Sequence, residues 1–373
     1  MSKVFAFSAE QDEFRRMVRR FVESNSSESA VRKQMETEHG FDPAVWSEMA
    51  GQLGLQGLII PEEFGGQGFG YVELCIALEE MGRSLLCAPY FSTVALAVHT
   101  LLQAGDERAQ GALLPRIASG ETVATVAFTE SNGRWDESGV EATARRDGGA
   151  WKIRGTKLYV LDGHTADVVI VAARTGAGVS LFHVAGDAAG LTRTPLATLD
   201  PTRKQARLDF DDVEATRIGA DGTGWSVLSA VLDLAAVALA AEQVGGAQKC
   251  LDMSVAYAKD RVQFGRPIGS FQAIKHKCAD VLLEVESARS AAYYAAWCAS
   301  ERSDELPAVA ALAKAYCSDA YVRAASENIQ IHGGIGFTWE HAAHLYFRRA
   351  KSSDLLFGDA SYHRELVARR IGI

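Results

Sequence analysis

The chain has 373 residues, enough for two or three domains, and 48% of them are apolar and 23% charged. The formal net charge of −9 argues against a general nucleic-acid-binding surface. Apolar runs stay short of the ~20 residues that span a membrane, and charges interrupt the N-terminal stretch before a signal-peptide core can develop. We therefore expect a cytoplasmic protein without a membrane span.

Cysteine spacing and missing motifs narrow the possible chemistry. The six cysteines are scattered and form no C-x-x-C pair, which predicts reduced, buried thiols. The H-E-x-x-H, G-x-S-x-G and P-loop motifs are absent, so zinc hydrolases, α/β-hydrolases and P-loop nucleotidases are poor candidates. The spacing of His332, His341, His344 and His363 matches no zinc pattern. We expect no metal site.

The first part of the chain, to about residue 118, has helical spacing. Ser8 and Gln11 form a capping-box pattern ahead of an apolar stripe. The expected helical segments include 43–53, 74–81 and 92–103, and the glycine-rich loop 61–68 interrupts them.

Near Thr122 the pattern changes to the alternating, β-branched one that is typical of strands. Asp147-Gly148 is a hairpin signal between two of the runs. The regular spacing of short strands predicts a small antiparallel β-domain. The strand-like runs are TVATVAFTE, EATARRDGGAWKIRGTKLYVL, ADVVIVAA, VSLFHVA and QARLDFDDVEA.

Helical spacing returns at about Trp225 and predicts an antiparallel bundle. The expected helices cover 225–259, 270–300, 307–328, about 341–352 and about 361–370, with a glycine-rich interruption over 328–338. The predicted fold class is therefore α+β. Its domains are an N-terminal α-helical domain (1–118), a middle antiparallel β-domain (119–220) and a C-terminal α-helical domain resembling a four-helix bundle (221–373).

The stretch RVQFGRPIGSFQAIKHKCAD, residues 261–280, carries the clearest binding signal. It places a cation and a ring, Arg261 and Phe264, before a tight turn, and Ser270 is the expected N-cap of the following helix. Such a corner suits an anion with a planar group attached, as in a dinucleotide. The residues by themselves are equally compatible with a solvated arginine at a helix–turn–helix corner.

Taken together, these segments resemble the acyl-CoA dehydrogenase family over essentially the whole chain. The shared features are the α–β–α order, the PEEFGGQG loop, Thr129-Glu130, R-x-x-F-G followed by Gln272, and Q-I-H-G-G-I-G-F. The resemblance implies a tetramer, either a homotetramer or an α2β2 assembly with a paralogous subunit. It also implies FAD as cofactor, an acyl-CoA as substrate and electron-transfer flavoprotein as electron acceptor.

In this family a carboxylate base removes the α-proton while flavin N5 accepts the β-hydride, and the FAD is shared between subunits. One subunit's β-domain holds the isoalloxazine ring, and Thr129 and Tyr159 are the matching positions here. The neighbouring subunit contacts the ADP half of FAD. The resemblance assigns this role to Arg261 at the pyrophosphate, Phe264 on the adenosine side, Gln272 nearby, and Gln330, Gly333 and Gly334 beside phosphate or ribose.

The other half of the site departs from the family pattern. Where the family has T-E-P-x-A-G-S-D, Arg134 and Trp135 would crowd the approach of flavin and CoA. Leu161 replaces a threonine that hydrogen-bonds the flavin edge.

The positions of the acid–base machinery also depart from the family. The usual base position aligns with Phe357, and an alternative base position aligns with Ala235. A CoA-contacting arginine is replaced by Ala236. Phenylalanine and alanine can neither accept a proton nor pair with a phosphate.

These departures leave several hypotheses. The first is a subunit without its own base that completes the FAD site of a paralogous catalytic subunit. The second is a homomeric dehydrogenase with a relocated base, with Asp359 as the first candidate and Glu340 as the second; the alternative role for Asp359 is a helix N-cap. The third is a scaffold or ligand-binding module that keeps the fold without redox activity, and other flavin chemistry is a fourth.

Overall fold

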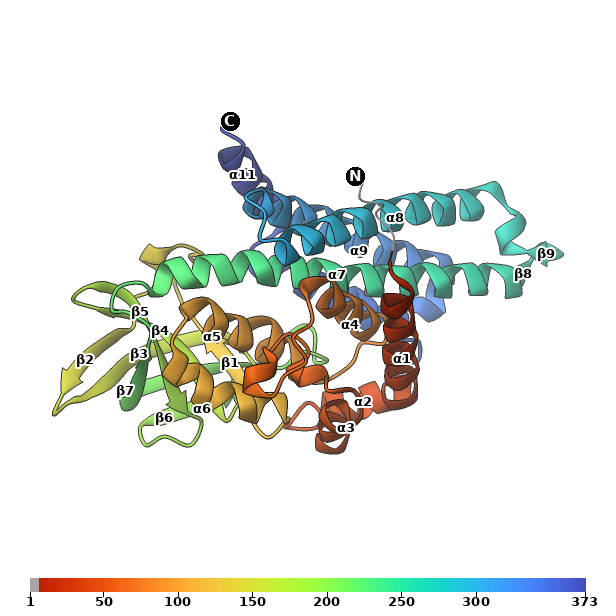
Figure 1. Ribbon diagram of the computed structural model, residues 1–373. Coiled ribbons are helices and arrows are strands. Elements are labelled where there is room, and N and C mark those ends of the chain that lie inside the picture. Colours follow the sequence, from red (N-terminus) through yellow and green to blue (C-terminus); the bar gives the residue numbers. More distant parts are fainter. Residues whose placement is uncertain (1–6) are drawn as a thin grey trace. The chain divides into compact units, whose positions relative to one another are not determined.

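The computed structural model describes residues 7–373 and divides into two compact units (Figure 1). Along the chain, helices precede a mainly antiparallel sheet and further helices follow it, which confirms the predicted α+β class. Unit 1 is formed by the segment ending at Arg32 together with Gly70–Leu86 and Ala236–Ile373, and unit 2 by Lys33–Phe69 and Cys87–Ala235. The predicted limits of the three sequence domains stay a prediction.

The N-terminal third is helical as predicted. Ser8 Oγ accepts a hydrogen bond from Gln11 N at 3.2 Å, and Gln11 Oε1 accepts one from Ser8 N at 3.0 Å, so the capping box is confirmed. The helix α2 was not expected from the sequence. The α-helices of this part are α1 (Ala9–Asn25), α2 (Glu28–Glu36), α3 (Pro43–Leu53), α4 (Tyr71–Arg83), α5 (His99–Ala104) and α6 (Glu107–Ala118), and a π-helical segment covers Phe91–Val98.

A seven-stranded sheet lies in unit 2. Its strand order is β1-β4-β2-β3-β7-β5, with β6 on β7 and an additional β4–β5 pairing that connects the path back to β4. The buried alternate residues of β7 and the six buried apolar residues at the start of β4 supply its core side chains. The strands are β1 (Ala124–Ala127), β2 (Thr143–Asp147), β3 (Ala150–Leu161), β4 (Val168–Thr175), β5 (Gly178–Ala185), β6 (Leu191–Pro195) and β7 (Gln205–Ile218).

Strand pairing confirms one prediction and corrects another. The hairpin signal is confirmed, because Asp147 pairs with Ala150 across Gly148 and Gly149, and both glycines have positive φ as a two-residue hairpin turn requires. The prediction of a purely antiparallel sheet was wrong, since β1 and β2 pair with β4 in parallel. Parallel pairing needs a long connection, and the whole β2–β3 hairpin separates β1 from β4 in the chain.

Unit 1 contains the long C-terminal helices. Glycines allow α7 to approach its neighbours closely: a Cβ on Gly245 would lie 1.8 Å from Glu79 O of α4, and one on Gly246 would lie 2.4 Å from the ring of Tyr321 on α9. The elements are α7 (Gly224–Asp260, whose first turns belong to unit 2), β8 (Val262–Gln263), β9 (Arg266–Pro267), α8 (Gln272–Ser300), α9 (Leu306–His332), α10 (Ala343–Leu355) and α11 (Ala360–Arg370).

Two predicted helix boundaries were wrong. Ser270 does not cap α8, because residues 268–270 form a 3-10 turn in which Ser270 Oγ donates to Pro267 O at 2.7 Å. The helix begins at Gln272, with Phe271 in the cap position. The other helix, α9, continues to His332 instead of ending near residue 328, and the glycine-rich interruption begins at Gly333.

Helix α7 contains a longer apolar stretch than expected, because the sequence analysis predicted no apolar run long enough to span a membrane. By length and composition alone it could cross a membrane, but 61% of its most apolar window is buried inside the structure, as in a core helix. All six cysteines are free, and five are buried while Cys278 is half-buried. Burial raises the pKa of the Cys317 thiol to about 12, which keeps it protonated and unreactive.

Candidate functional site

The hairpin that follows α7 presents an unpaired cation and an exposed ring. Arg261 N donates to Tyr257 O at 2.8 Å at the end of the helix, and its side chain is exposed with no ion pair to any residue from 7 to 373. Phe264 lies in the turn with φ of 53° and is 92% exposed. Its ring lies edge-to-face against that of Phe271, at a centroid distance of 6.1 Å. An exposed cation beside an exposed ring suits a phosphate-bearing aromatic ligand.

The loop after α9 exposes backbone. Gly333 ends the helix with φ of 63° and ψ of −139°, a conformation that favours glycine. A Cβ added to Gly333 or Gly334 would meet nothing within 4 Å, so the chain leaves the space beside both residues open. Gln330, one turn earlier, is exposed. Another group can therefore approach this backbone closely.

Side-chain contacts bring the hairpin and the glycine loop together. The ring of Tyr257, one turn before Arg261, stacks on His332 at a centroid distance of 4.3 Å. His332 Nδ1 is hydrogen-bonded to Asn328 O at 2.8 Å, and Ser254 Oγ donates to Asn328 Oδ1 at 3.0 Å. The end of α7 is thereby fixed to the end of α9.

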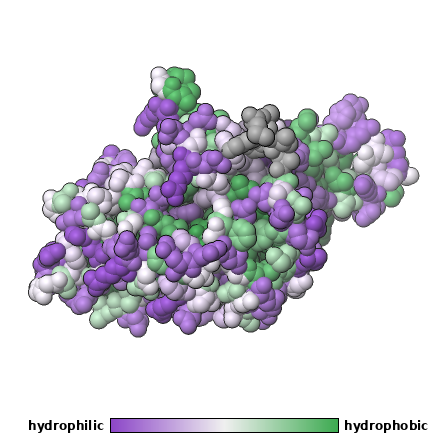
Figure 2. Space-filling model, viewed as in Figure 1, coloured by the Kyte–Doolittle hydropathy of each residue, from purple (hydrophilic) through white to green (hydrophobic). Residues whose placement is uncertain are grey.

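Gln272 lies at the same end of unit 1. Helices α8 and α9 are antiparallel, since Lys277 pairs with Glu327 and Glu284 pairs with Arg323. The exposed first residue of α8, Gln272, therefore lies toward the C-terminal end of α9. Figure 1 shows the β8–β9 hairpin at the tip between α7 and α8, and in Figure 2 this tip is covered mainly by hydrophilic residues with apolar ones between them.

We call this surface the hairpin–glycine surface. It consists of the six positions that the sequence predicted for the ADP half of a dinucleotide. They are Arg261, Phe264, Gln272, Gln330, Gly333 and Gly334.

Unit 2 brings the other two predicted cofactor positions together. Leu158 N donates to Thr129 O at 2.9 Å, which joins the segment after β1 to β3. Tyr159 follows directly in a bulge of β3, with φ of 55° and 56% of its surface exposed. Thr129 itself is buried. The tyrosine ring is therefore available for stacking, whereas Thr129 contributes mainly backbone geometry.

A buried ion pair holds this segment in place. Lys157 Nζ donates to Glu130 Oε1 at 2.6 Å and to Phe128 O at 3.3 Å, and the same Glu130 oxygen accepts hydrogen bonds from the backbone N of Glu141 and Ala142. Burial lowers the pKa of Lys157 to about 8, although the nearby Glu130 charge opposes the shift. Sequence reasoning missed Lys157. Its only signal is a lysine at an inward position of a strand.

The structure shows the surroundings of the residues that depart from the family pattern. The ring of Trp135 lies 5.8 Å from that of Phe128, next to Thr129. Leu161, Ala235 and Ala236 are all buried and apolar. None of these three can donate a hydrogen bond, remove a proton or pair with an anion from its side chain.

The turn before α11 contains the expected base position. Phe357 is buried there with φ of 62°, and Gly358 follows with φ of 101°. Asp359 caps α11, because its carboxylate accepts a hydrogen bond from Tyr362 N at 2.8 Å. The N-cap interpretation of Asp359 is therefore confirmed. Glu340, the second candidate, lies exposed after the glycine loop.

Two buried groups that the sequence did not suggest hold this turn. Lys314 Nζ donates to Asp354 O at 3.0 Å, to Gly358 O at 3.1 Å and to Ser318 Oγ at 3.0 Å. Burial lowers the pKa of Lys314 to about 8. The ring of His363 is hydrogen-bonded to Phe357 O at 3.1 Å, and burial lowers its pKa to about 4, so the imidazole is neutral.

Comparison with known proteins gives matches over nearly the whole chain. The N-terminal, middle and C-terminal domain models of acyl-CoA dehydrogenases match residues 8–121, 125–213 and 222–372. The acyl-CoA dehydrogenase IpdE2 of Mycolicibacterium smegmatis is 37% identical over 351 residues, which are 94% of this chain and 95% of that protein.

Two solved structures are similar over the full length. A variant of the Tcur3481–Tcur3483 steroid ACAD matches with a TM-score of 0.88 and 32% identity, over 97% of both chains. The ChsE4–ChsE5 complex from Mycobacterium tuberculosis matches with a TM-score of 0.90 and 28% identity, over 99% of this chain and 98% of that one. The chain therefore belongs to the acyl-CoA dehydrogenase family.

Proposed function

We propose that this chain is the FAD-site-completing subunit of a heterotetrameric, α2β2 acyl-CoA dehydrogenase and lacks a catalytic base of its own. The carrying observation is the asymmetry of its site. The hairpin–glycine surface keeps every position for the ADP half of FAD, whereas the base positions hold Phe357 and Ala235. FAD, bound in the assembly, would supply the hydride acceptor for α,β-dehydrogenation of an acyl-CoA.

The retained surface fits the ADP half of FAD. The unpaired guanidinium of Arg261 would bind the pyrophosphate through charge-assisted hydrogen bonds, and the exposed ring of Phe264 would pack on the adenosine side. The open backbone of Gly333 and Gly334 would approach phosphate or ribose, beside Gln330. In this proposal the ring of Phe264, which is 92% exposed in the single chain, is covered in the assembly.

The absence of a base and of a CoA-contacting arginine explains why this proposal needs a second subunit. Removal of an α-proton requires a carboxylate held close to the α-carbon in a water-poor site. Phe357 and Ala235 offer none, and Ala236 offers no cation for CoA. In this proposal the paralogous subunit provides the base, the CoA contact and the seat of the isoalloxazine ring.

The relatives support a two-component assembly. The names of two similar solved structures describe pairs of components, Tcur3481–Tcur3483 and ChsE4–ChsE5, and the first is described as a steroid ACAD. We infer a paralogous partner, a steroid or other bulky acyl-CoA as substrate, electron-transfer flavoprotein as electron acceptor, and a cytoplasmic location.

A homomeric dehydrogenase with Asp359 as base is the second candidate. The carboxylate of Asp359 already accepts the hydrogen bond that caps α11, and it is one side-chain carbon shorter than the usual glutamate. A scaffold of the same fold without redox activity is the third candidate. It would bind no flavin in any assembly.

The test is to purify the chain alone and together with a candidate acyl-CoA dehydrogenase paralogue from the same organism. We expect little flavin in the lone protein, and a mixed complex that carries FAD and is bleached by acyl-CoA. Stoichiometric flavin in the lone protein, reduced by acyl-CoA, would contradict the proposal. A mixed complex without flavin would favour the scaffold.

A further inference from the structure

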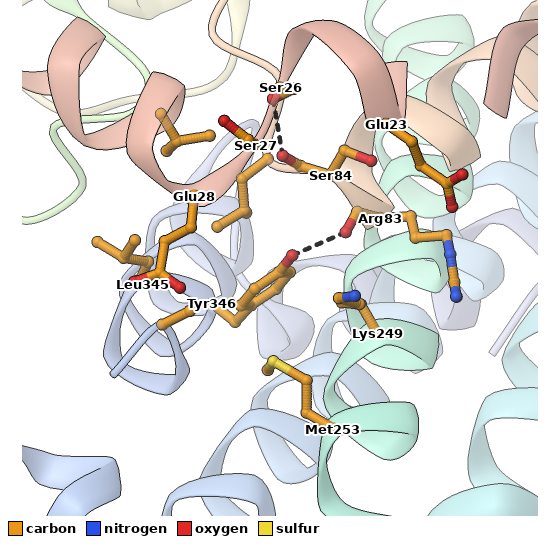
Figure 3. Close-up of a pocket in the computed structure, with 13 residues that line it drawn as sticks. Glu23, Ser26, Ser27, Glu28, Arg83, Ser84, Lys249, Met253, Leu345 and Tyr346 are labelled. Carbon is orange, nitrogen blue, oxygen red and sulfur yellow. Dashed lines mark hydrogen bonds between the residues drawn. The ribbon is translucent and has the colours of Figure 1, made fainter. Parts of the chain in front are cut away.

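Unit 1 contains a cavity of about 290 Å³ that shares no residue with the hairpin–glycine surface (Figure 3). Its walls come from the end of α1 and the start of α2, the end of α4, the C-terminal third of α7 and the start of α10. The lining residues that carry the argument are Glu23, Glu28, Arg83, Lys249, Met253 and Tyr346.

One wall of the cavity is cationic. Lys249 on α7 is half-buried, and its ammonium forms no ion pair or hydrogen bond with any residue from 7 to 373. Figure 3 shows its nitrogen between Arg83 and Tyr346. Arg83, in contrast, is paired with Asp252 at 2.7 Å. Lys249 is therefore the group on this wall with a charge still to be matched.

Two carboxylates also line the cavity. Glu28, at the start of α2, lies across Tyr346 from Lys249 in Figure 3, and Arg32 donates to it at 2.8 Å. Glu23, on the last turns of α1, is exposed and accepts no hydrogen bond from a described residue, and in Figure 3 it lies beside Arg83, on the same side of Tyr346 as Lys249. A ligand with only a negative charge would be repelled by these two carboxylates. A ligand with only a positive charge would be repelled by Lys249.

The other lining residues are either apolar or already hydrogen-bonded within the chain. Tyr346 Oη donates to Arg83 O at 2.8 Å, and Ser26 Oγ donates to Ser84 O at 2.9 Å, so these carbonyls need no further partner. Burial raises the pKa of Tyr346, which keeps its hydroxyl protonated as the donor. Val31, Leu85, Met253 and Leu345 supply apolar surface.

From this arrangement we propose that the cavity binds a small zwitterion, an α-amino acid with an apolar side chain. The carboxylate of the ligand pairs with Lys249, its ammonium pairs with Glu28 across the cavity, and its side chain contacts the apolar wall. Ligand pockets usually span ~300–1,000 Å³, so a cavity of about 290 Å³ is too small for a nucleotide or CoA. This inference does not depend on the proposed dehydrogenase role.

Calorimetry on the purified full-length chain tests the charge requirement. The probes are leucine, 4-methylpentanoate, which keeps the carboxylate alone, and isoamylamine, which keeps the ammonium alone, at matched ionic strength. We expect saturable binding of leucine and at least about tenfold weaker binding of the other two, because each lacks one charged hydrogen bond. No saturable binding of leucine, or equal binding of 4-methylpentanoate, overturns the proposal.

Variants locate the binding to the cavity. Lys249→Met keeps the length of the side chain and removes its charge, and we expect it to weaken leucine binding about tenfold or more. Lys33→Met, on the exposed side of α2, is the matched control and should bind as the wild type does. If Lys249→Met fails to fold by circular dichroism, Glu28→Gln serves in its place. Unchanged leucine affinity in the folded variant overturns the proposal.

Discussion

Tyr257 and His332 stack at a centroid distance of 4.3 Å with 30° between their planes. The first residue lies one turn before the hairpin that carries Arg261, and the second lies directly before Gly333. The contact therefore joins two segments that are more than 60 residues apart in the sequence into one surface. In the proposed assembly this surface acts as a single unit on the ADP half of FAD.

Arg261→Ala should lower the flavin occupancy of the mixed complex. Loss of a charge-assisted hydrogen bond to the pyrophosphate should weaken FAD binding about tenfold or more. The ratio of flavin to protein absorbance, measured after dialysis, reports the change. Lys259→Ala removes a neighbouring exposed charge and is the control. A ratio that stays at the wild-type value in Arg261→Ala would remove this arginine from the site.

The substitution Gly334→Ala should lower cofactor binding without lowering the stability of the fold. An added Cβ there meets nothing within 4 Å of the chain, and the φ of Gly334 is not in the region that disfavours other residues. Thermal stability of the lone protein should stay within about 0.5 kcal/mol of wild type. Flavin occupancy of the mixed complex should fall, because the methyl group occupies the space proposed for phosphate or ribose.

Alanine at Gly333 provides the comparison. Its φ of 63° with ψ of −139° is strained for alanine, so the lone protein should lose roughly 1–3 kcal/mol of stability. If Gly334→Ala binds flavin as well as wild type does, the glycine loop is only a helix terminus.

Local patterns predicted most of the fold. The capping box at Ser8 and the Asp147-Gly148 hairpin depend on residues close in sequence, and both were found. Parallel pairing of β1 with β4 was not predictable in this way, because it depends on which strands meet after a long connection. Ser270 was assigned as a cap on residue type alone, but a 3-10 turn already uses its hydroxyl.

R-x-x-F-G and Q-I-H-G-G are short contiguous motifs, and the structure places their residues on one surface, while their role in binding a cofactor stays a prediction. Buried single side chains could not be predicted in this way. Lys157 and Lys314 were missed, because lysine in a sequence normally indicates a solvated face. Only the folded chain shows that each is fully buried against carbonyl or carboxylate oxygens.

The pair Asp359→Asn and Asp359→Ala should distinguish a cap from a base. Asparagine keeps an oxygen that can accept from Tyr362 N, so stability should change little. Alanine removes the cap and should lower the free energy of unfolding by about 1 kcal/mol. Neither variant should alter acyl-CoA oxidation by the mixed complex per bound flavin. A large loss of turnover in Asp359→Asn, with flavin content unchanged, would establish the relocated-base alternative.

Lys314→Met should change the pH dependence of stability. The pKa of Lys314 is lowered from 10.5 to about 8 in the folded protein, chiefly by burial. Between these two values the unfolded chain binds a proton that the folded chain does not, so this lysine makes the folded state more stable as pH rises from about 8 to about 10.5. Below pH 8 both states are protonated, and the cost of burying the charge is fully present.

The stability difference between wild type and Lys314→Met isolates this group from others that titrate in the same range. Methionine leaves the carbonyls of Asp354 and Gly358 without their donor, which should cost about 1–3 kcal/mol at all pH values. On top of that offset, the wild type should gain up to about 3 kcal/mol relative to the variant between pH 8 and 10.5. Urea unfolding at several pH values measures the difference. A difference that is constant over this range would mean that Lys314 keeps an ordinary pKa despite its burial.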